Sequence, residues 1–195
     1  MSQRAFSKAR QKIKWEALEE LFRASVESSR NEGLKLWRGY RVMAADGTFL
    51  SLPSDAALLE HFGGLGRGRS SATALASLLC DLENDVIADA SIGPISGNER
   101  DMALGHVDRL PGMESHAGMR ELVAFDRGYP SGEFVKSLRD KEIAFVMCVR
   151  KGFLPGSSAR DVEAAMRKGG PLERAALFAL ATSEEETLVT SLPES

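Results

Sequence analysis

The sequence has few cysteines, few histidines and few aromatic residues. Of its 195 residues two are cysteines and three are histidines, and the aromatic fraction is 7%. Cys80 and Cys148 are far apart, and each lies in an apolar stretch. This pattern indicates buried thiols in a reducing compartment and argues against a disulfide framework. No Cys/His spacing is typical of a zinc site, so a zinc-binding module is also excluded.

Long hydrophobic segments are also missing. No stretch approaches the roughly 18 apolar residues that a membrane-spanning helix needs. The start of the chain is polar and basic, without the apolar run of a signal peptide. We therefore expect a cytoplasmic protein without a membrane partner.

The charge balance lacks a strong bias of either sign. Lys and Arg number 25, Asp and Glu number 28, and the formal net charge is −3. No global basic field therefore indicates a nucleic-acid partner, and any such contact must come from local patches. With 43% hydrophobic and 27% charged residues, the composition is typical of a globular protein with one sizeable core.

One local basic patch lies at the start of the chain. A helical segment is predicted there, because apolar residues follow one helical face at Ile13, Trp15, Leu18, Leu21, Phe22 and Val26. Lys8, Arg10 and Lys12 precede the first acidic residue. They form either a solvated helix face or a segment that contacts DNA phosphates.

A second patch lies in the glycine-rich stretch GGLGRGRSS, which carries Arg67 and Arg69. The stretch follows a predicted helix and not a strand, so it is a weak match to a dinucleotide-binding fingerprint. We interpret it as a mobile loop. Its arginines either contact an anion, such as a DNA phosphate, or remain in solvent.

Two aspartates stand out because each follows a short apolar run. Asp46 lies in RVMAADGTFLSLP, and Asp126 lies in ELVAFDRGYPSGEF. A carboxylate at the end of a strand is costly to bury unless it has a partner. Either both are ordinary turn residues, with Asp46-Gly47 forming a hairpin, or they converge to hold a cation.

The remaining pattern predicts alternating strands and helices. Ser54 or Asp55 would cap a short helix, and Ser131 would cap a later one. The expected elements are a helix at 54–62, two strands within 72–93 joined at 83–85, a helix at 98–110, a strand at 121–125, a helix at 132–142, a strand at 143–150, a helix at Asp161–Lys168 and a strand at Thr187–Leu192. The strand–helix–strand unit around Ser131 predicts two parallel strands.

This element order is that of a ribonuclease H-like domain. The predicted fold is α/β, a mixed sheet flanked by helices, with an N-terminal helical segment. In this topology the first and fourth strands are neighbours. Their ends would bring Asp46 and Asp126 together.

Several blocks resemble one protein family. They include FSKARQKI, RVMAADGT, GNERDMALGHVDRL and DRGYPS. Together they are similar to the DDE transposases of bacterial insertion sequences, in the branch named after insertion sequence four. The resemblance runs from about residue 4 to the end, with a weaker patch at about 152–182. It implies an N-terminal segment at 1–36 and a catalytic domain at 37–195, with 151–186 as an insertion-like region.

The resemblance implies roles for particular residues. Asp46 corresponds to the first catalytic acid and Asp126 to the second, and both would bind Mg²⁺ or Mn²⁺. Carboxylate oxygens are the ligands that Mg²⁺ prefers. Arg127 and Tyr129 belong to the second block and would position DNA or the aspartate.

The resemblance also concerns an acidic-basic pair and the family's third acid. Glu99 and Arg100 match an acidic-basic pair of the family, for which a structural salt bridge is the alternative. The family's third acid, in the pattern Tyr-x2-Arg-x3-Glu-x6-Lys, is not found within the 195 residues. Glu184–Glu186 lack its surrounding residues and are interpreted as a solvated acidic turn. The chain is therefore expected to be a truncated fragment that is inactive alone.

The implied function is DNA transposition, by metal-dependent phosphodiester cleavage and strand transfer at insertion-sequence ends. The partners would be double-stranded DNA of the ends and the target. Self-association is an additional possibility. The protein would be associated with the nucleoid. One alternative is an inactive remnant that only binds DNA or regulates. Another is a ribonuclease H-fold nuclease unrelated to transposition. A hydrolase is disfavoured, because no G-x-S-x-G motif occurs and neither cysteine has an obvious histidine partner.

Overall fold

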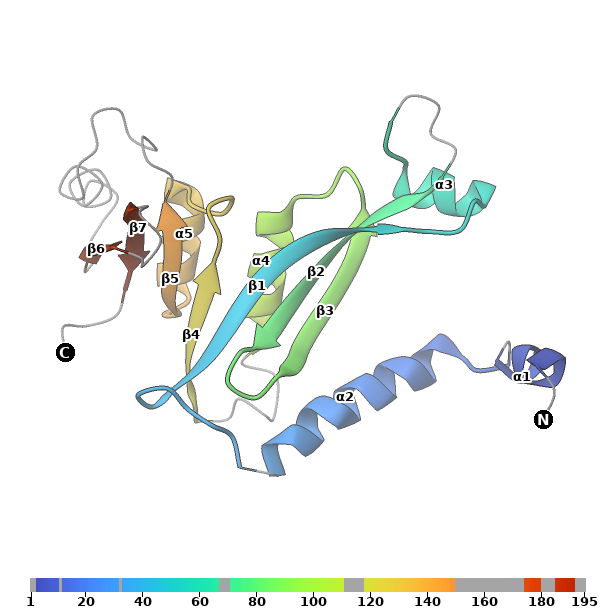
Figure 1. Cartoon of the computed structure of the whole chain (residues 1–195), viewed down its shortest axis with the longest axis horizontal. Coiled ribbons are helices and arrows are strands. Elements are labelled where there is room, and N and C mark those ends of the chain that lie inside the picture. The colour runs from blue at the N-terminus through green and yellow to red at the C-terminus, as the bar shows by residue number, and fades with distance from the viewer. Residues whose placement is uncertain are drawn as a thin grey trace.

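The computed structural model describes residues 3–10, 12–31, 33–66, 71–110, 118–149, 174–179 and 185–191. Its elements (Figure 1) are α1 Gln3–Arg10, α2 Trp15–Asn31, β1 Tyr40–Ser51, α3 Ala56–Phe62, β2 Thr73–Asp81, β3 Val86–Pro94, α4 Glu99–Arg109, β4 Arg120–Phe125, α5 Gly132–Asp140, β5 Ala144–Val149, β6 Arg174–Ala179 and β7 Glu185–Thr190. The predicted helix at Asp161–Lys168, and also Arg67, Arg69 and Glu184, lie outside the described residues. No described helix is long and apolar enough to cross a membrane.

The described strands form one mixed sheet in the order β3-β2-β1-β4-β5-β7-β6. β1 pairs antiparallel with β2, and β2 pairs antiparallel with β3. On its other side β1 is parallel to β4, which is parallel to β5. Three antiparallel strands followed by two parallel ones, with α4 between β3 and β4 and α5 between β4 and β5, give the ribonuclease H-like fold. The predicted fold class is confirmed.

The largest difference from the predicted elements is in β1. Residues 46 and 47 form no hairpin turn, and Asp46 does not end a strand, because β1 runs without interruption from Tyr40 to Ser51. Its antiparallel ladder with β2 extends from Met43↔Asp81 to Ser51↔Thr73. The hydrogen bonds of this ladder outweigh the local turn preference of Asp-Gly.

The acidic stretch near the end of the chain also differs from the predicted structure. Glu185 and Glu186 are not in a turn: they are the first residues of β7, opposite Ala179 and Phe178 of β6. The predicted strand at Thr187–Leu192 therefore begins and ends two residues earlier. Pairing with β6, which the sequence pattern did not indicate, accounts for this extension.

Several local predictions are confirmed. β2 and β3 form the expected hairpin, with the turn at 82–85. The Asp55 carboxylate caps α3 by accepting from the amides of Ala57 and Leu58. The Ser131 hydroxyl caps α5 by accepting from Phe134 N. These caps satisfy amide groups that a helix leaves unpaired at its start.

The N-terminal segment forms two helices rather than one. α1 ends at Arg10, and α2 begins at Trp15. The amides of Lys12 and Ile13 bond to carbonyl oxygens three residues earlier, the tighter turn that is frequent at helix ends. The predicted apolar face is also mostly uncovered, since Trp15 is 68% and Leu21 is 66% exposed, whereas Val26 is buried beside β3.

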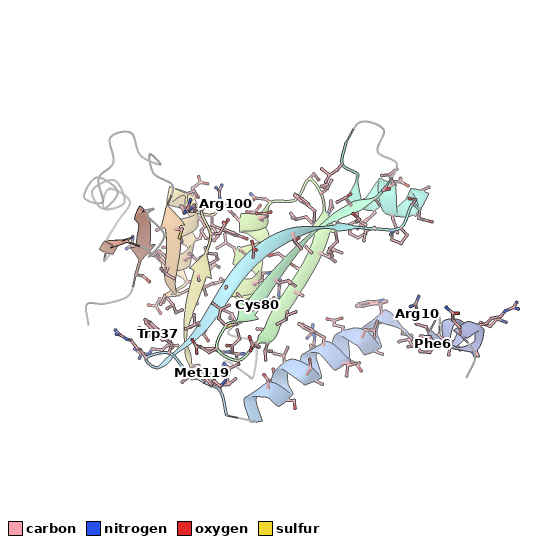
Figure 2. The ribbon with its side chains drawn as sticks, in the orientation of Figure 1. Phe6, Arg10, Trp37, Cys80, Arg100 and Met119 are labelled. Carbon is pink, nitrogen blue, oxygen red and sulfur yellow. The ribbon has the colours of Figure 1, made fainter. Side chains whose placement is uncertain are left out.

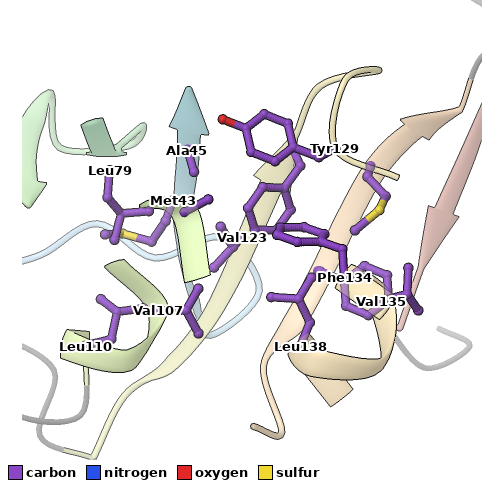
Figure 3. Packing of buried hydrophobic residues seen from close by; sticks show 14 of the residues in the cluster. Met43, Ala45, Leu79, Val107, Leu110, Val123, Tyr129, Phe134, Val135 and Leu138 are labelled. Carbon is purple, nitrogen blue, oxygen red and sulfur yellow. The ribbon is translucent and has the colours of Figure 1, made fainter. Parts of the chain in front are cut away.

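The core lies between the sheet and the helices α4 and α5, which cover the same face (Figure 1). Figure 3 shows its packing around Met43 of β1, Val123 of β4 and Leu138 of α5. Met43 and Ala45 point into this core, so Asp46, between Ala45 and Gly47 on the same strand, is on the opposite face. Cys80 and Cys148 are half-buried and not buried as expected.

Candidate active site

The parallel pairing of β1 and β4 places the two aspartates at one edge of the shared ladder. The ladder runs from Tyr40↔Arg120 to Ala44↔Ala124. Asp46 and Asp126 each follow the last pair by two residues. Because the two residues have equal register on parallel strands, both lie just beyond the same end of the ladder.

Each carboxylate is exposed and is held by a nearby amide. Asp46 Oδ1 accepts a hydrogen bond from Gly47 N at 2.9 Å. Asp126 Oδ1 accepts from Gly128 N at 2.7 Å. A Cβ on Gly128 would lie 3.0 Å from that same oxygen. The tight turn at Asp126 therefore requires glycine two residues later.

Arg100 fixes the turn that carries Asp126. Its Nε donates to the carbonyl oxygen of Tyr129 at 3.0 Å, and its Nη2 donates to that of Gly128 at 2.6 Å. Asn98 caps α4 by accepting from Arg100 N at 3.0 Å. Within the part of the chain that the structure describes, no ion pair joins Glu99 to Arg100. The side chain of Arg100 instead connects α4 to the loop after β4.

Tyr129 is a core residue with a polar end at the site. Its side chain is 1% exposed, and its ring packs against Phe125 and Phe134. Burial raises the pKa of its hydroxyl, and the negative charges of Glu99, Asp46 and Asp126 raise it further. The hydroxyl of Tyr129 is therefore within the field of all three carboxylates.

A cavity of about 290 Å³ adjoins these groups. Its apolar wall comes from Phe49, Leu75 and Ile95, and its polar wall comes from Glu99 and Arg100. Gly128 and Tyr129 close it on the side of Asp126. The cavity provides space for a small ligand beside the turn that follows Asp126.

The donors present suit a hard divalent cation. Asp46 and Asp126 offer carboxylate oxygens, which Mg²⁺ and Mn²⁺ prefer, and Mg²⁺ retains several waters when few protein ligands bind it. Among the described residues, no three His, Cys, Asp or Glu side chains are close enough to hold a metal ion together. The arrangement therefore fits a cation held by two carboxylates and water.

The other predicted site residues are spread over the molecule. Lys8, Arg10 and Lys12 are exposed in and just after α1. Figure 2 shows Arg10 at the end of the molecule away from Arg100, so this basic patch is separate from the aspartates. Arg127 is exposed next to Asp126. For Tyr129, burial of the ring leaves the hydroxyl as the group that can act on a ligand or an aspartate.

A buried polar network was missed by the sequence interpretation. His106 Nδ1 lies 2.7 Å from Asp89 Oδ2, and His106 Nε2 lies 3.1 Å from Ser77 Oγ. Arg109 Nε also donates to Asp89 Oδ2 at 2.7 Å. The order resembles a Ser-His-Asp triad, but Ser77 and His106 are 0% exposed. No substrate can reach Ser77, so the network serves to hold α4 on the sheet.

Comparison with known sequences identifies the family. Residues 37–186 match the family described as the transposase DDE domain. This match includes both Asp46 and Asp126. A comparison with curated proteins gave no match.

Comparison with solved structures gave distant similarities. A piggyBac transposase synaptic complex with hairpin DNA is 13% identical, with a TM-score of 0.41 over 80% of this chain and 34% of that chain. The chain thus spans about a third of the length of that transposase. Endonuclease V of Ciona intestinalis, in complex with a 24mer DNA containing an inosine, is 9% identical, with a TM-score of 0.38 over 91% and 83% of the two chains.

Proposed function

Because the chain belongs to the transposase DDE domain family, we propose that it carries the metal-dependent chemistry of DNA transposition, cleavage and strand transfer at phosphodiester bonds. Asp46 and Asp126 are the catalytic, cation-binding residues of this proposal. The observation that supports it most is their equal register on the parallel strands β1 and β4. The DNA ends of an insertion sequence and its target are the proposed substrates.

The protein's contribution is to hold oxygen ligands and DNA in a fixed geometry. Asp46 is fixed in the middle of a twelve-residue strand. Asp126 is fixed by its bond from Gly128 N and by the hydrogen bonds from Arg100 to the same turn. Such restraint favours catalysis because reacting groups then need little further ordering.

Mg²⁺ or Mn²⁺, when bound, would activate the attacking oxygen and stabilise the leaving oxygen at phosphorus. Arg127, exposed beside Asp126, is placed to contact a DNA phosphate in the same substrate complex. Tyr129 keeps the Asp126 turn packed on the core through its ring.

DNA binding is proposed to involve a second region. Lys8, Arg10 and Lys12 are exposed and locally concentrated, which favours sequence-independent contact with phosphates. Arg67 and Arg69 are proposed to contribute in the same way. We accordingly divide the chain into a DNA-contacting segment at 1–36 and a catalytic domain at 37–195, with 151–186 as an insertion-like region. The family match at 37–186 supports this division.

The proposal extends to the origin of the protein. The blocks around Asp46 and Asp126 support membership of the insertion-sequence-four branch, and hence a bacterial mobile element. Residues 1–195 contain no Tyr-x2-Arg-x3-Glu-x6-Lys pattern, so low activity of this chain alone is part of the proposal. The alternative is a catalytically inactive remnant that acts by binding DNA or by regulating.

A supercoiled-plasmid assay with Mg²⁺ or Mn²⁺ tests this function. We expect little cleavage by the 195-residue chain, and metal-dependent nicking once a C-terminal Tyr-x2-Arg-x3-Glu-x6-Lys helix is added. Asp46→Asn and Asp126→Asn in the extended protein should abolish nicking, because they keep the shape and remove the charge. Nicking that survives both changes would contradict the proposal. An extended protein that binds DNA but neither binds cations nor cleaves would favour the inactive remnant.

A further inference from the structure

Glu99 lies directly against β1 at Gly47, the residue that follows Asp46. It is the first residue of α4, and its side chain covers the backbone of Gly47. A Cβ built on Gly47 would lie 2.9 Å from both Cγ and Cδ of Glu99 and 3.0 Å from its Oε1. These distances are shorter than ordinary carbon contacts. A glycine at position 47 is therefore what allows the Glu99 carboxylate to approach the strand beside Asp46.

The hydroxyl of Tyr129 is a second, independent sign of a ligand at this place. It is a buried polar atom without a hydrogen-bond partner among the described residues. Figure 3 shows it pointing away from Phe134 and Val123, on the side of β1. A buried hydroxyl without a partner is destabilising, and such groups are rare unless water or an ion satisfies them.

The cavity beside this residue indicates the kind of ligand. Tyr129 lines it together with Glu99, Arg100 and Gly128 of the Asp126 turn. A carboxylate and a hydroxyl at one cavity suit a cation with its bound water. Glu99 and the two aspartates are too far apart to coordinate one bare ion together. A hydrated cation can bridge them, because Mg²⁺ retains several of its waters in such sites.

We propose that Glu99 is a further acidic residue of the cation site, and that its carboxylate accepts hydrogen bonds from water on the cation held by Asp46 and Asp126. The hydroxyl of Tyr129 donates to the same layer of water. This inference rests on the proposed function, since it needs a cation at the two aspartates. It assigns Glu99 a role that a helix-capping acid would not have.

The competing explanation is local. An acid in the first turn of a helix interacts favourably with the helix dipole. Glu133 occupies the first turn of α5 in the same way and is exposed. Glu133→Gln is therefore the matched control for Glu99→Gln, since both remove a first-turn charge but only Glu99 lies against β1, at Gly47.

Calorimetric titration of the full chain with MnCl₂ separates these explanations. We expect Glu99→Gln to weaken Mn²⁺ binding by about tenfold or more, the usual effect of removing a group that supports the ligands of a metal. Glu133→Gln should bind within twofold of the unchanged protein. Asp46→Asn and Asp126→Asn should lose binding, and circular dichroism confirms that each variant folds.

The outcomes distinguish the inference from the proposed function. If both aspartate variants lose Mn²⁺ binding and Glu99→Gln does not, the role of Glu99 is wrong and the cation site stands. If the unchanged protein binds no Mn²⁺, or if no aspartate variant alters binding, both fail. If Glu99→Gln and Glu133→Gln weaken binding equally, a general charge effect replaces the specific role of Glu99.

Discussion

Arg100 Nε donates a hydrogen bond of 3.0 Å to the carbonyl oxygen of Tyr129, and this contact ties the start of α4 to the turn after β4. The same guanidinium donates to Gly128 O. One side chain thereby sets the position of the turn in which Asp126 lies. The connection spans the sequence between α4 and β4 and makes the site depend on a helix that contributes no aspartate.

Removing this guanidinium should loosen the turn. Arg100→Ala is expected to lower the free energy of unfolding by about 1–3 kcal/mol, because it leaves two carbonyl oxygens without a charged donor. Arg100→Lys should recover little of this, since an ammonium group lacks the planar fork that reaches both oxygens. Urea denaturation measures the change.

Arg23→Ala provides the control for Arg100→Ala. Its ion pair with Glu19 is on the surface, with the Arg23 side chain 74% exposed. Such a pair contributes only about 0.3–0.5 kcal/mol. Equal losses for Arg23→Ala and Arg100→Ala would show that Arg100 has no special structural role.

Gly47→Ala should disturb Glu99 while leaving the fold intact. The added methyl group would meet the flexible end of Glu99, which can rotate away. We therefore expect the free energy of unfolding to change by less than about 1 kcal/mol, while Mn²⁺ affinity falls as in Glu99→Gln. The double variant should be no weaker than the worse single one, since both changes remove the same interaction.

Gly93→Ala is the control for this change. Gly93 lies in the neighbouring strand β3, and a Cβ there would meet no atom within 4 Å. It should leave both stability and Mn²⁺ affinity close to those of the unchanged protein. Normal cation binding by Gly47→Ala would indicate that Glu99 does not need its present position.

Asp89 should make part of the stability depend on acid pH. Burial acts to raise its pKa, but hydrogen bonds and charge from His106 and Arg109 outweigh burial, so the pKa is lowered. A lowered pKa contributes stability that is present above the unfolded value of about 3.9 and is lost as pH falls through the folded value. The stability difference between the unchanged protein and Asp89→Asn should therefore shrink below about pH 4.

Urea unfolding at several pH values from 7 to 3 measures this difference. Asp85→Asn makes the same chemical change at an exposed turn position, where the φ angle of 53° is one that asparagine tolerates. Asp85→Asn should show no comparable loss of unfolding free energy at neutral pH. A difference for Asp89→Asn that stays constant over the whole range would contradict the assigned role of the Asp89 carboxylate.

The basic segment at the N-terminus should bind duplex DNA without sequence preference. Reversing Lys8, Arg10 and Lys12 to glutamate should weaken DNA binding. It should also reduce the slope of log affinity against log salt concentration by about 2–3, at roughly 0.9 for each phosphate that the protein no longer neutralises. Fluorescence anisotropy at several salt concentrations measures both quantities.

A variant with Arg23, Lys35 and Lys136 reversed carries the same change in net charge at other positions. It should retain more of the affinity and of the salt dependence than the N-terminal variant. Equal losses in the two variants would show that net charge, and not the N-terminal patch, governs binding. Binding that is insensitive to salt would contradict phosphate contacts altogether.

The parts of the fold that follow from local chemistry were predictable. The caps at Asp55 and Ser131 and the β2–β3 hairpin depend on neighbouring residues, so the sequence pattern contains them. The continuity of β1 was not predictable locally, because Asp46-Gly47 has the preference of a turn and only pairing with β2 overrides it. Likewise β7 includes Glu185 because β6 pairs with it.

The candidate site also has some features that the local sequence predicts and others that it does not. The placement of Asp46 and Asp126 followed from the expected parallel strands. The contact of Glu99 with Gly47 and the bonds of Arg100 join segments that are distant in sequence, and no periodicity encodes them. The network of Ser77, Asp89 and His106 was missed for the same reason, since its members come from β2, β3 and α4.

A crystal structure of the chain grown with MnCl₂ would show whether the two aspartates share a cation. We expect an anomalous peak at the end of the β1–β4 ladder, with carboxylate oxygens of both Asp46 and Asp126 at about 2.0–2.3 Å, the range for small divalent cations with oxygen ligands. Carboxylates on opposite sides of the sheet, or a Mn²⁺ ion bound elsewhere with none between them, would contradict the proposed cation site.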